Sequence, residues 1–93
     1  MSEIVIKQLP GFKKAYKKLH SNERKAVDNT INNIIKNPNV GEEKKGDLAG
    51  IYVYRFKFHA KEFLLGYEWC PKERLLLALG VHENFYRDLM KKT

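Results

Sequence analysis

The sequence predicts an α+β fold in the order β-α-α-β-β-β-α, with a small, mostly antiparallel sheet of four strands. Three observations lead to this prediction. A short β-branched run opens the chain, two segments with apolar residues at helical spacing follow it, and three runs with strand character come after residue 50. Because each helical segment has a single apolar stripe, we expect the two helices to form a hairpin on one face of the sheet. A short C-terminal helix completes the order.

The first strand is expected at residues 4–9, IVIKQL, because this run is rich in β-branched residues and ends at Pro10 and Gly11. The spacing of apolar residues then becomes helical, with one stripe made of Phe12, Ala15, Tyr16 and Leu19. Four basic residues fall on the opposite side of this helix: Lys13, Lys14, Lys17 and Lys18. Taken alone, such a basic side is usually only the solvated face of a helix.

The second helix is expected to have Ser21 or Asn22 as its N-cap. It should stop at Asn37, because Pro38 disfavours helical geometry in the residue before it. Its buried face would consist of Ala26, Val27, Ile31, Ile34 and Ile35. Residues 10–37 are therefore expected to form the helical hairpin.

After a polar loop at residues 38–50, three strands are expected at residues 51–59, 63–70 and 75–81. Short turns at residues 60–62 and 71–73 join them, so both pairs should be antiparallel hairpins. The last strand, LLLALGV, is apolar throughout, which indicates a central strand buried on both faces. The final short helix is expected at about residues 83–92.

The segment YRFKFH, residues 54–59, alternates between rings and basic or titratable groups. Successive side chains of a strand point to opposite faces, so Tyr54, Phe56 and Phe58 should face the helical hairpin. The other set, Arg55, Lys57 and His59, should then lie on the uncovered face of the sheet. Such a row is most often a solvated surface, and its alternative role is to hold a phosphate.

Length and charge restrict the class of protein. Ninety-three residues make one small domain, expected to span residues 1–93. The net charge is +7, and the basic excess lies in residues 1–20 and 51–93, which suits a polyanionic partner such as nucleic acid or an acidic protein. The single cysteine, the absence of a signal-peptide pattern and the absence of a long apolar run lead us to expect a cytoplasmic protein without membrane contact.

Several kinds of site find no support in the sequence. It has no HExxH motif and no cysteine pair, and its three histidines fall on different elements, so we expect no metal site. It also has no glycine-rich phosphate loop and no local Ser-His-Asp or Cys-His pattern. We therefore expect no cofactor.

The remaining candidates suit one reaction that requires no metal, the cleavage of RNA by attack of its 2′-hydroxyl on the adjacent phosphorus. This reaction requires a base, an acid and fixed cations around the phosphate. Arg55 and Lys57 could supply the cations, and His82 could give or take a proton near neutral pH. Tyr86 could stack on a base or hydrogen-bond the 2′-hydroxyl. Each of these residues taken singly is more often structural.

The segments KKGDLAGIYVYRFKFH and LLLALGVHENFYRDLMKK, together with the element order, resemble the RelE/ParE superfamily of bacterial toxins from type II toxin–antitoxin modules. The resemblance covers essentially the whole chain. It implies one of two activities: RelE- and YafQ-like members are ribosome-dependent mRNA endonucleases, whereas ParE-like members poison DNA gyrase. It also implies a cognate antitoxin, for which a basic toxin predicts an acidic binding segment.

Carried over residue by residue, the resemblance sets Arg55 and Lys57 on the phosphate-facing pair of the family and His82 on its general-acid position. Tyr86 matches the aromatic residue that YafQ-like relatives place four residues after that histidine. An arginine of the family falls at Leu64 here, which is a departure. Residues expected to contact RNA or the ribosome are Lys13, Lys14, Lys17, Lys18, Lys44, Lys45 and His59.

The general base is the least determined role, and Glu68 or His59 is the expected candidate. The endonuclease is the leading hypothesis, because both His82 and Tyr86 are present. The alternatives are a gyrase inhibitor without nuclease activity and a plain interaction module whose basic face binds an acidic partner.

Overall fold

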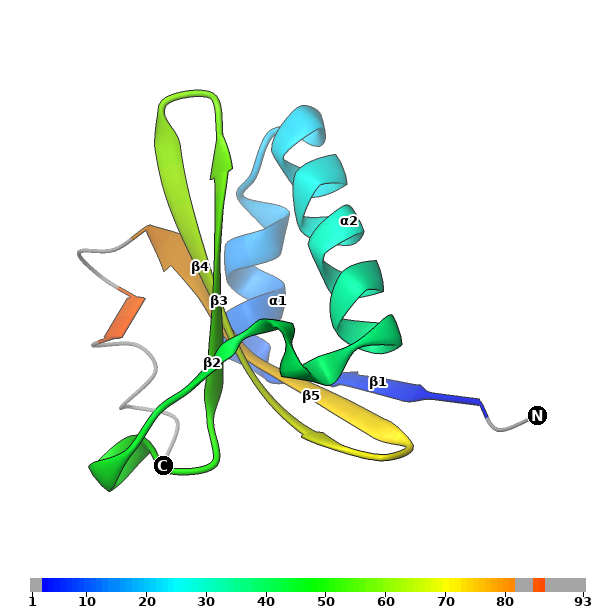
Figure 1. The fold of residues 1–93 in the computed structure, drawn as a ribbon. Helices are drawn as coiled ribbons and strands as arrows, with labels where there is room; N and C mark the ends of the chain where they lie inside the picture. Colours follow the sequence, from blue (N-terminus) through cyan, green and yellow to red (C-terminus); the bar gives the residue numbers. More distant parts are fainter. Residues whose placement is uncertain (1–2, 82–84, 87–93) are drawn as a thin grey trace.

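The computed structural model describes residues 3–81 and 85–86, and within them two helices pack on a five-stranded sheet (Figure 1). Strand β1 (Val5–Gln8) leads into helices α1 (Pro10–Lys17) and α2 (Ser21–Lys36). Two 3₁₀ turns, η1 (Pro38–Val40) and η2 (Gly46–Leu48), flank the short strand β2 (Glu42–Glu43). The chain then forms strands β3 (Tyr52–Phe58), β4 (Lys61–Cys70) and β5 (Glu73–Val81).

The strand order in the sheet is β1-β5-β4-β3-β2. β1 pairs with β5 in parallel, and the other three pairs are antiparallel. The prediction of four strands is wrong by one, because β2 arises within the segment expected to be a loop. Its two glutamates have little strand propensity, and only their pairing with Val53 and Tyr52 defines the strand.

Strand β5 lies inside the sheet, between β1 and β4, and is buried on both faces, which confirms the prediction that LLLALGV is an interior strand. A β-bulge supports this burial. Gly66 pairs with Ala78 and Tyr67 with Leu76, so Leu77 is the extra residue between them. Both Leu77 and Ala78 consequently pack into the core cluster on the face away from the helices.

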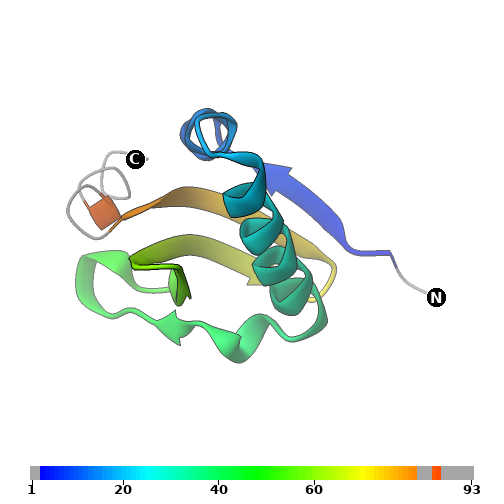
Figure 2. The same cartoon turned by 90° about the horizontal axis from the view of Figure 1, so that it is seen from above.

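The sheet carries an apolar cluster on each face. The helices cover the first face, as Figures 1 and 2 show, with a buried cluster made of Phe12, Val27, Ile34, Leu65, Tyr67, Leu76 and Leu79. Tyr54 and Phe56 pack against this cluster, which confirms that the aromatic row of β3 faces the helices. The second face has its own buried cluster: Ile51, Val53, Leu64, Leu77, Ala78 and Phe85.

The second face is therefore not a bare sheet surface, and the prediction of an uncovered face is wrong for part of it. Phe85 is 1% exposed and packs on this face, with Tyr86 beside it. Both residues have helical geometry, but the rest of the predicted C-terminal helix and His82 lie outside the described residues. Within the described part of the chain, neither helix is long and apolar enough to cross a bilayer.

The two ends of α2 are fixed by groups that differ from those expected. The N-cap is His20 rather than Ser21 or Asn22, and the backbone N–H of His20 donates to the Glu23 carboxylate at 2.9 Å. At the other end, the guanidinium of Arg74 donates to the carbonyls of Ile34 at 3.1 Å and Ile35 at 3.0 Å. Arg74 is 3% exposed, and it satisfies carbonyls that the end of a helix leaves without partners.

The β3–β4 hairpin is tighter than predicted. β3 ends at Phe58 and β4 begins at Lys61, so His59 and Ala60 alone form the loop. His59 has a backbone φ of 57°, a left-handed conformation that β-hairpin loops normally give to glycine or asparagine. The expected turn at residues 60–62 and a strand reaching residue 59 are therefore wrong.

Candidate functional site

Arg55 and Lys57 form the basis of the candidate site on the second face of the sheet. Both are exposed on β3, between half-buried aromatic neighbours that point the other way. Arg55 lies opposite Leu64 of β4, and Lys57 lies opposite Glu62. Because directly paired residues share a face, the two cations stand beside a buried leucine and a partly buried carboxylate.

The short strand β2 brings a third cation to the same face. Glu42 pairs with Val53, which places Glu42 and Lys44 on the side of the sheet that carries Arg55. The backbone N–H of Lys44 donates to the carbonyl of Ile51 at 2.8 Å, which fixes the chain at this point. The Lys44 side chain is 21% exposed, and its Nζ lies 2.8 Å from Glu42 Oε1.

Lys44 also reaches the aromatic residue of the site. Its Nζ lies 5.7 Å from the centroid of the Tyr86 ring, a distance at which a cation is attracted by the ring face. Tyr86 in turn packs edge-on against Phe85, which anchors it to the buried cluster. The hydrogen bond to Glu42 raises the pKa of Lys44, partial burial opposes this rise, and Tyr86 adds to it. Lys44 is thus a fixed cation at neutral pH.

Glu42 was absent from the sequence-based candidates. The hydrogen bond and charge of Lys44 lower the pKa of Glu42, and the charge of Arg55 contributes a smaller part of the same shift. Glu42 is therefore an ionised carboxylate paired with Lys44, and Arg55 adds to the same effect. The sequence offered no signal for it, because its position on this face depends on the pairing of β2 with β3.

A buried tyrosine holds the loop that carries these residues. The hydroxyl of Tyr67 donates to the carbonyl of Pro38 at 2.6 Å and accepts from the N–H of Gly41 at 3.0 Å. A Cβ at Gly41 would lie 2.7 Å from the Tyr67 hydroxyl oxygen, so a larger residue cannot fit without a shift. Burial raises the pKa of Tyr67, which keeps its hydroxyl protonated and able to donate. The two hydrogen bonds of the Tyr67 hydroxyl therefore fix the chain just before Glu42 and Lys44.

Two residues proposed as the base do not join this group. Glu68 lies on the same face but pairs with Leu75, beyond the bulge. It is four residues along β4 from Leu64, a separation of roughly 13 Å at the rise of a β-strand. His59 leaves the strand altogether, because it sits in the hairpin loop and its ring contacts Phe58 at a centroid distance of 4.2 Å. The expectation that His59 continues the row of Arg55 and Lys57 is wrong.

The remaining predicted contacts are more dispersed. Lys45 is exposed and precedes η2. The three lysines of α1 and its C-cap Lys18 are all exposed, but α1 packs on the opposite face of the sheet through Phe12. These are the residues expected to dock on ribosomal RNA: Lys13, Lys14, Lys17 and Lys18. The structure does not bring them together with Arg55 and Lys57.

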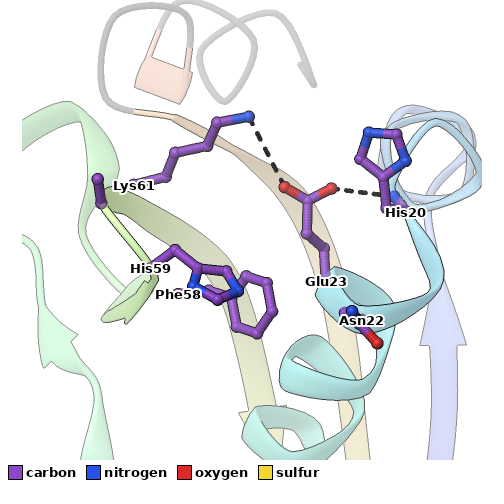
Figure 3. Close-up of a pocket in the computed structure, with 7 residues that line it drawn as sticks. His20, Asn22, Glu23, Phe58, His59 and Lys61 are labelled. Carbon is purple, nitrogen blue, oxygen red and sulfur yellow. Dashed lines mark hydrogen bonds and ion pairs between the residues drawn. The ribbon is translucent and has the colours of Figure 1, made fainter.

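A separate pocket of about 390 Å³ lies on the helix side, between the β3–β4 hairpin tip and the start of α2 (Figure 3). Its lining includes His20, Asn22, Glu23, Phe58, His59 and Lys61. Lys61 Nζ lies 3.7 Å from Glu23 Oε2, so an ion pair joins the hairpin to the helix. The pKa of Glu23 is lowered, first by the backbone N–H of His20 and also by the charge of Lys61. Across residues 3–81 and 85–86, no group of histidine, cysteine and acidic side chains could hold a metal ion.

The sequence and the fold of this chain can be compared with those of known proteins. A family model described as the ParE-like toxin of type II bacterial toxin–antitoxin systems matches residues 6–90. The chain belongs to this family. The match covers nearly the whole chain, and it confirms the resemblance to RelE/ParE superfamily toxins drawn from the sequence.

Several solved toxin structures have the same fold as this ParE-like toxin. A double mutant of the Escherichia coli toxin RelE in the free state matches with a TM-score of 0.73 and 17% identity over 99% of this chain and 98% of that one. The RelBE2 toxin–antitoxin complex from Mycobacterium tuberculosis matches with a TM-score of 0.72 and 17% identity, over 86% and 99% of the two chains. A YoeB/ParE toxin from Agrobacterium tumefaciens matches with a TM-score of 0.68 and 17% identity, over 85% and 99%. A search of curated proteins finds no match for the ParE-like toxin.

Proposed function

We propose that this toxin arrests growth by cutting mRNA on the ribosome, in the cytoplasm, through attack of the RNA 2′-hydroxyl on the adjacent phosphorus. The observation that supports the proposal most is the gathering of three cations and a tyrosine on one face. Arg55 and Lys57 are exposed, and Lys44 stands between Glu42 and the Tyr86 ring. A phosphate that gains negative charge during the reaction is stabilised by fixed cations of this kind.

The reaction divides among these residues as follows. The guanidinium of Arg55 can hold two phosphate oxygens in a fork, and Lys57 adds a compact charge beside it. The 2′-oxygen forms a bond to phosphorus, the bond from phosphorus to the 5′-oxygen breaks, and the products are a 2′,3′-cyclic phosphate and a 5′-hydroxyl. Tyr86, with Lys44 over its ring, would stack on a base next to the cut. His82 would give the proton that the departing 5′-oxygen requires.

The base that takes the 2′-hydroxyl proton must come within hydrogen-bond reach of the phosphate site. Two carboxylates meet this condition better than Glu68. Glu42 lies beside Lys44, and Glu62 lies opposite Lys57. We assign the role to Glu42, since its carboxylate lies 2.8 Å from Lys44 Nζ and also feels the charge of Arg55. Lys44 lowers the pKa of Glu42, so Glu42 is ionised at neutral pH and can accept a proton, but as a weaker base than an isolated glutamate.

The second candidate function is inhibition of DNA gyrase without catalysis, and one residue favours it. The position at which the sequence resemblance expects an arginine carries Leu64, which is fully buried opposite Arg55. The site thus has one cation fewer than that pattern. An acidic antitoxin segment that covers the cationic face would silence the toxin under either function.

Inducible expression with pulse labelling of protein and DNA synthesis separates the two functions. If the proposal holds, protein synthesis stops first, and cut mRNA accumulates. Glu42→Gln should weaken this arrest, while Glu68→Gln, the same change at the distant glutamate, should leave it intact. An early stop in DNA synthesis with gyrase-cleaved DNA would select the second function. Continued growth with both syntheses intact would reject both and leave the interaction module.

A further inference from the structure

The pocket at the tip of the β3–β4 hairpin has two aromatic side chains on one wall and polar groups on the other. Phe58 and His59 stand on the hairpin side in Figure 3, in contact with each other at a ring distance of 4.2 Å. The groups on the α2 side are His20, Asn22 and Glu23, and Lys61 reaches across to Glu23. The chemistry proposed for Arg55 and Lys57 uses none of these groups.

The backbone conformation of His59 decides which side chain the hairpin loop can present at the pocket. Its φ of 57° is unfavourable for a residue with a Cβ, and glycine would adopt it without cost. The two-residue loop requires this conformation, and histidine is among the non-glycine residues that adopt it most often. His59 places an exposed imidazole at the pocket, which glycine could not do.

Size and chemistry together point to the ligand. A pocket of about 390 Å³ is near the lower end of the range for small-molecule sites, and suits one planar ring system with its attached sugar. Aromatic and imidazole rings stack on nucleobases, an asparagine amide offers both donors and an acceptor to a base edge, and a lysine ammonium pairs with phosphate. We propose that this hairpin-tip pocket binds one unstacked base of a single-stranded RNA. The choice of RNA as the ligand depends on the function proposed above.

The base would lie against Phe58 and His59, with its polar edge toward Asn22. Lys61 is exposed and pairs with Glu23 only at 3.7 Å, so it can turn to a phosphate when RNA arrives. Lys57 and Phe58 are adjacent in the chain and point to opposite faces of β3. Among the described residues, β2 pairs only with Tyr52 and Val53, so the rest of that edge of β3 has no neighbouring strand. A strand of RNA crossing this edge can therefore reach both the pocket and the phosphate site.

NMR titration of the isotope-labelled full chain with 5′-mononucleotides (AMP, GMP, CMP and UMP, each as a separate probe) tests the proposal. We expect saturable shifts in the backbone signals of Asn22, His59 and Lys61. Phe58→Leu keeps an apolar side chain without the ring, and should weaken binding roughly tenfold.

His59→Gly is the sharpest variant, because binding and stability should change in opposite directions. It removes the imidazole and the unfavourable φ together, so the protein should become more stable while nucleotide binding weakens several-fold. A variant that is more stable and binds as well as the wild type would overturn the proposal. Loss of binding cannot then be attributed to unfolding.

Two further arms separate this proposal from its competitors. Arg55→Ala with Lys57→Ala should leave mononucleotide shifts at the pocket unchanged, even if RNA cleavage is lost. An acidic peptide should not shift the pocket signals, and if it does while no nucleotide does, the pocket is a protein-docking site and the proposal is wrong. Nucleotide binding in a protein that cuts no RNA would refute the proposed function alone.

Discussion

Arg74 occupies an environment that its sequence position does not suggest. It is 3% exposed, and its guanidinium donates to four backbone carbonyls rather than to a carboxylate: those of Ile34, Ile35, Cys70 and Glu73. Its guanidinium carbon also lies 5.7 Å from the Trp69 ring. Because a cation is stabilised at the carboxyl end of a helix, this one side chain joins α2 to the sheet.

Replacement of Arg74 by methionine should therefore destabilise the fold strongly. The change keeps much of the apolar volume but removes the donor to one buried and three partly buried carbonyls, which should cost about 3 kcal/mol in the free energy of unfolding. Urea denaturation measures the loss. Arg55→Met, the same change at an exposed arginine, should alter stability by less than about 0.5 kcal/mol. Equal effects of the two changes would refute the role given to Arg74.

At the scale of elements, the short strand β2 decides the composition of the site. It contains only Glu42 and Glu43, and its place depends on two contacts from elsewhere in the chain. These are its pairing with β3 and the hydrogen bonds from Tyr67 to Pro38 and Gly41. The Tyr67 hydroxyl on β4 thus helps to fix the position of Glu42 and Lys44 beside Arg55.

Removal of that hydroxyl in Tyr67→Phe should cost about 2 kcal/mol, because a partly buried carbonyl and a partly buried backbone N–H lose their partner. The loop should also loosen, so the amide of Lys44 should exchange faster with solvent, since its bond to Ile51 depends on the same segment. Urea denaturation and hydrogen exchange measure the two effects. Tyr52→Phe is the matched control, because the Tyr52 hydroxyl makes only a long, exposed contact of 3.4 Å to Glu43. Equal effects of both changes on stability and exchange would contradict this account.

Local patterns predicted the elements that depend on local chemistry. The helical stripes, the stop at Pro38 and the apolar run of β5 were each sufficient to locate an element. Most of the features missed depend on pairing or packing that the sequence pattern does not display. β2 exists through β3, Arg74 is buried through the end of α2, and the two-residue loop at His59 follows from the register of β3 against β4.

For the whole molecule, the alternation of β3 is the feature that links sequence to function. It sends the rings of Tyr54 and Phe56 to the helix side and leaves Arg55 and Lys57 exposed on the other. The sequence predicted this division but not the surroundings of the cations. Phe85 and Tyr86 cover part of that face, and Glu42 and Lys44 complete the group through β2.

Under the proposed function, the net charge of +7, concentrated in residues 1–20 and 51–93, would attract RNA, and the face with Arg55 would supply the local geometry. The lysines of α1 lie on the other side of the sheet, so their contribution should be to attraction and not to chemistry. Mutation of Lys13 and Lys17 to alanine should weaken binding in a salt-dependent way and leave the position of the cut unchanged.

The chemistry of the cut ends on mRNA bound to purified ribosomes distinguishes the proposed reaction from other cleavage reactions. We expect a 2′,3′-cyclic phosphate on one fragment and a 5′-hydroxyl on the other, with the rate reduced about 100-fold by Arg55→Ala and left unchanged by Lys72→Ala in the distant β4–β5 turn. Fragments with a 3′-hydroxyl and a 5′-phosphate, or no cut at all, would contradict the proposed reaction.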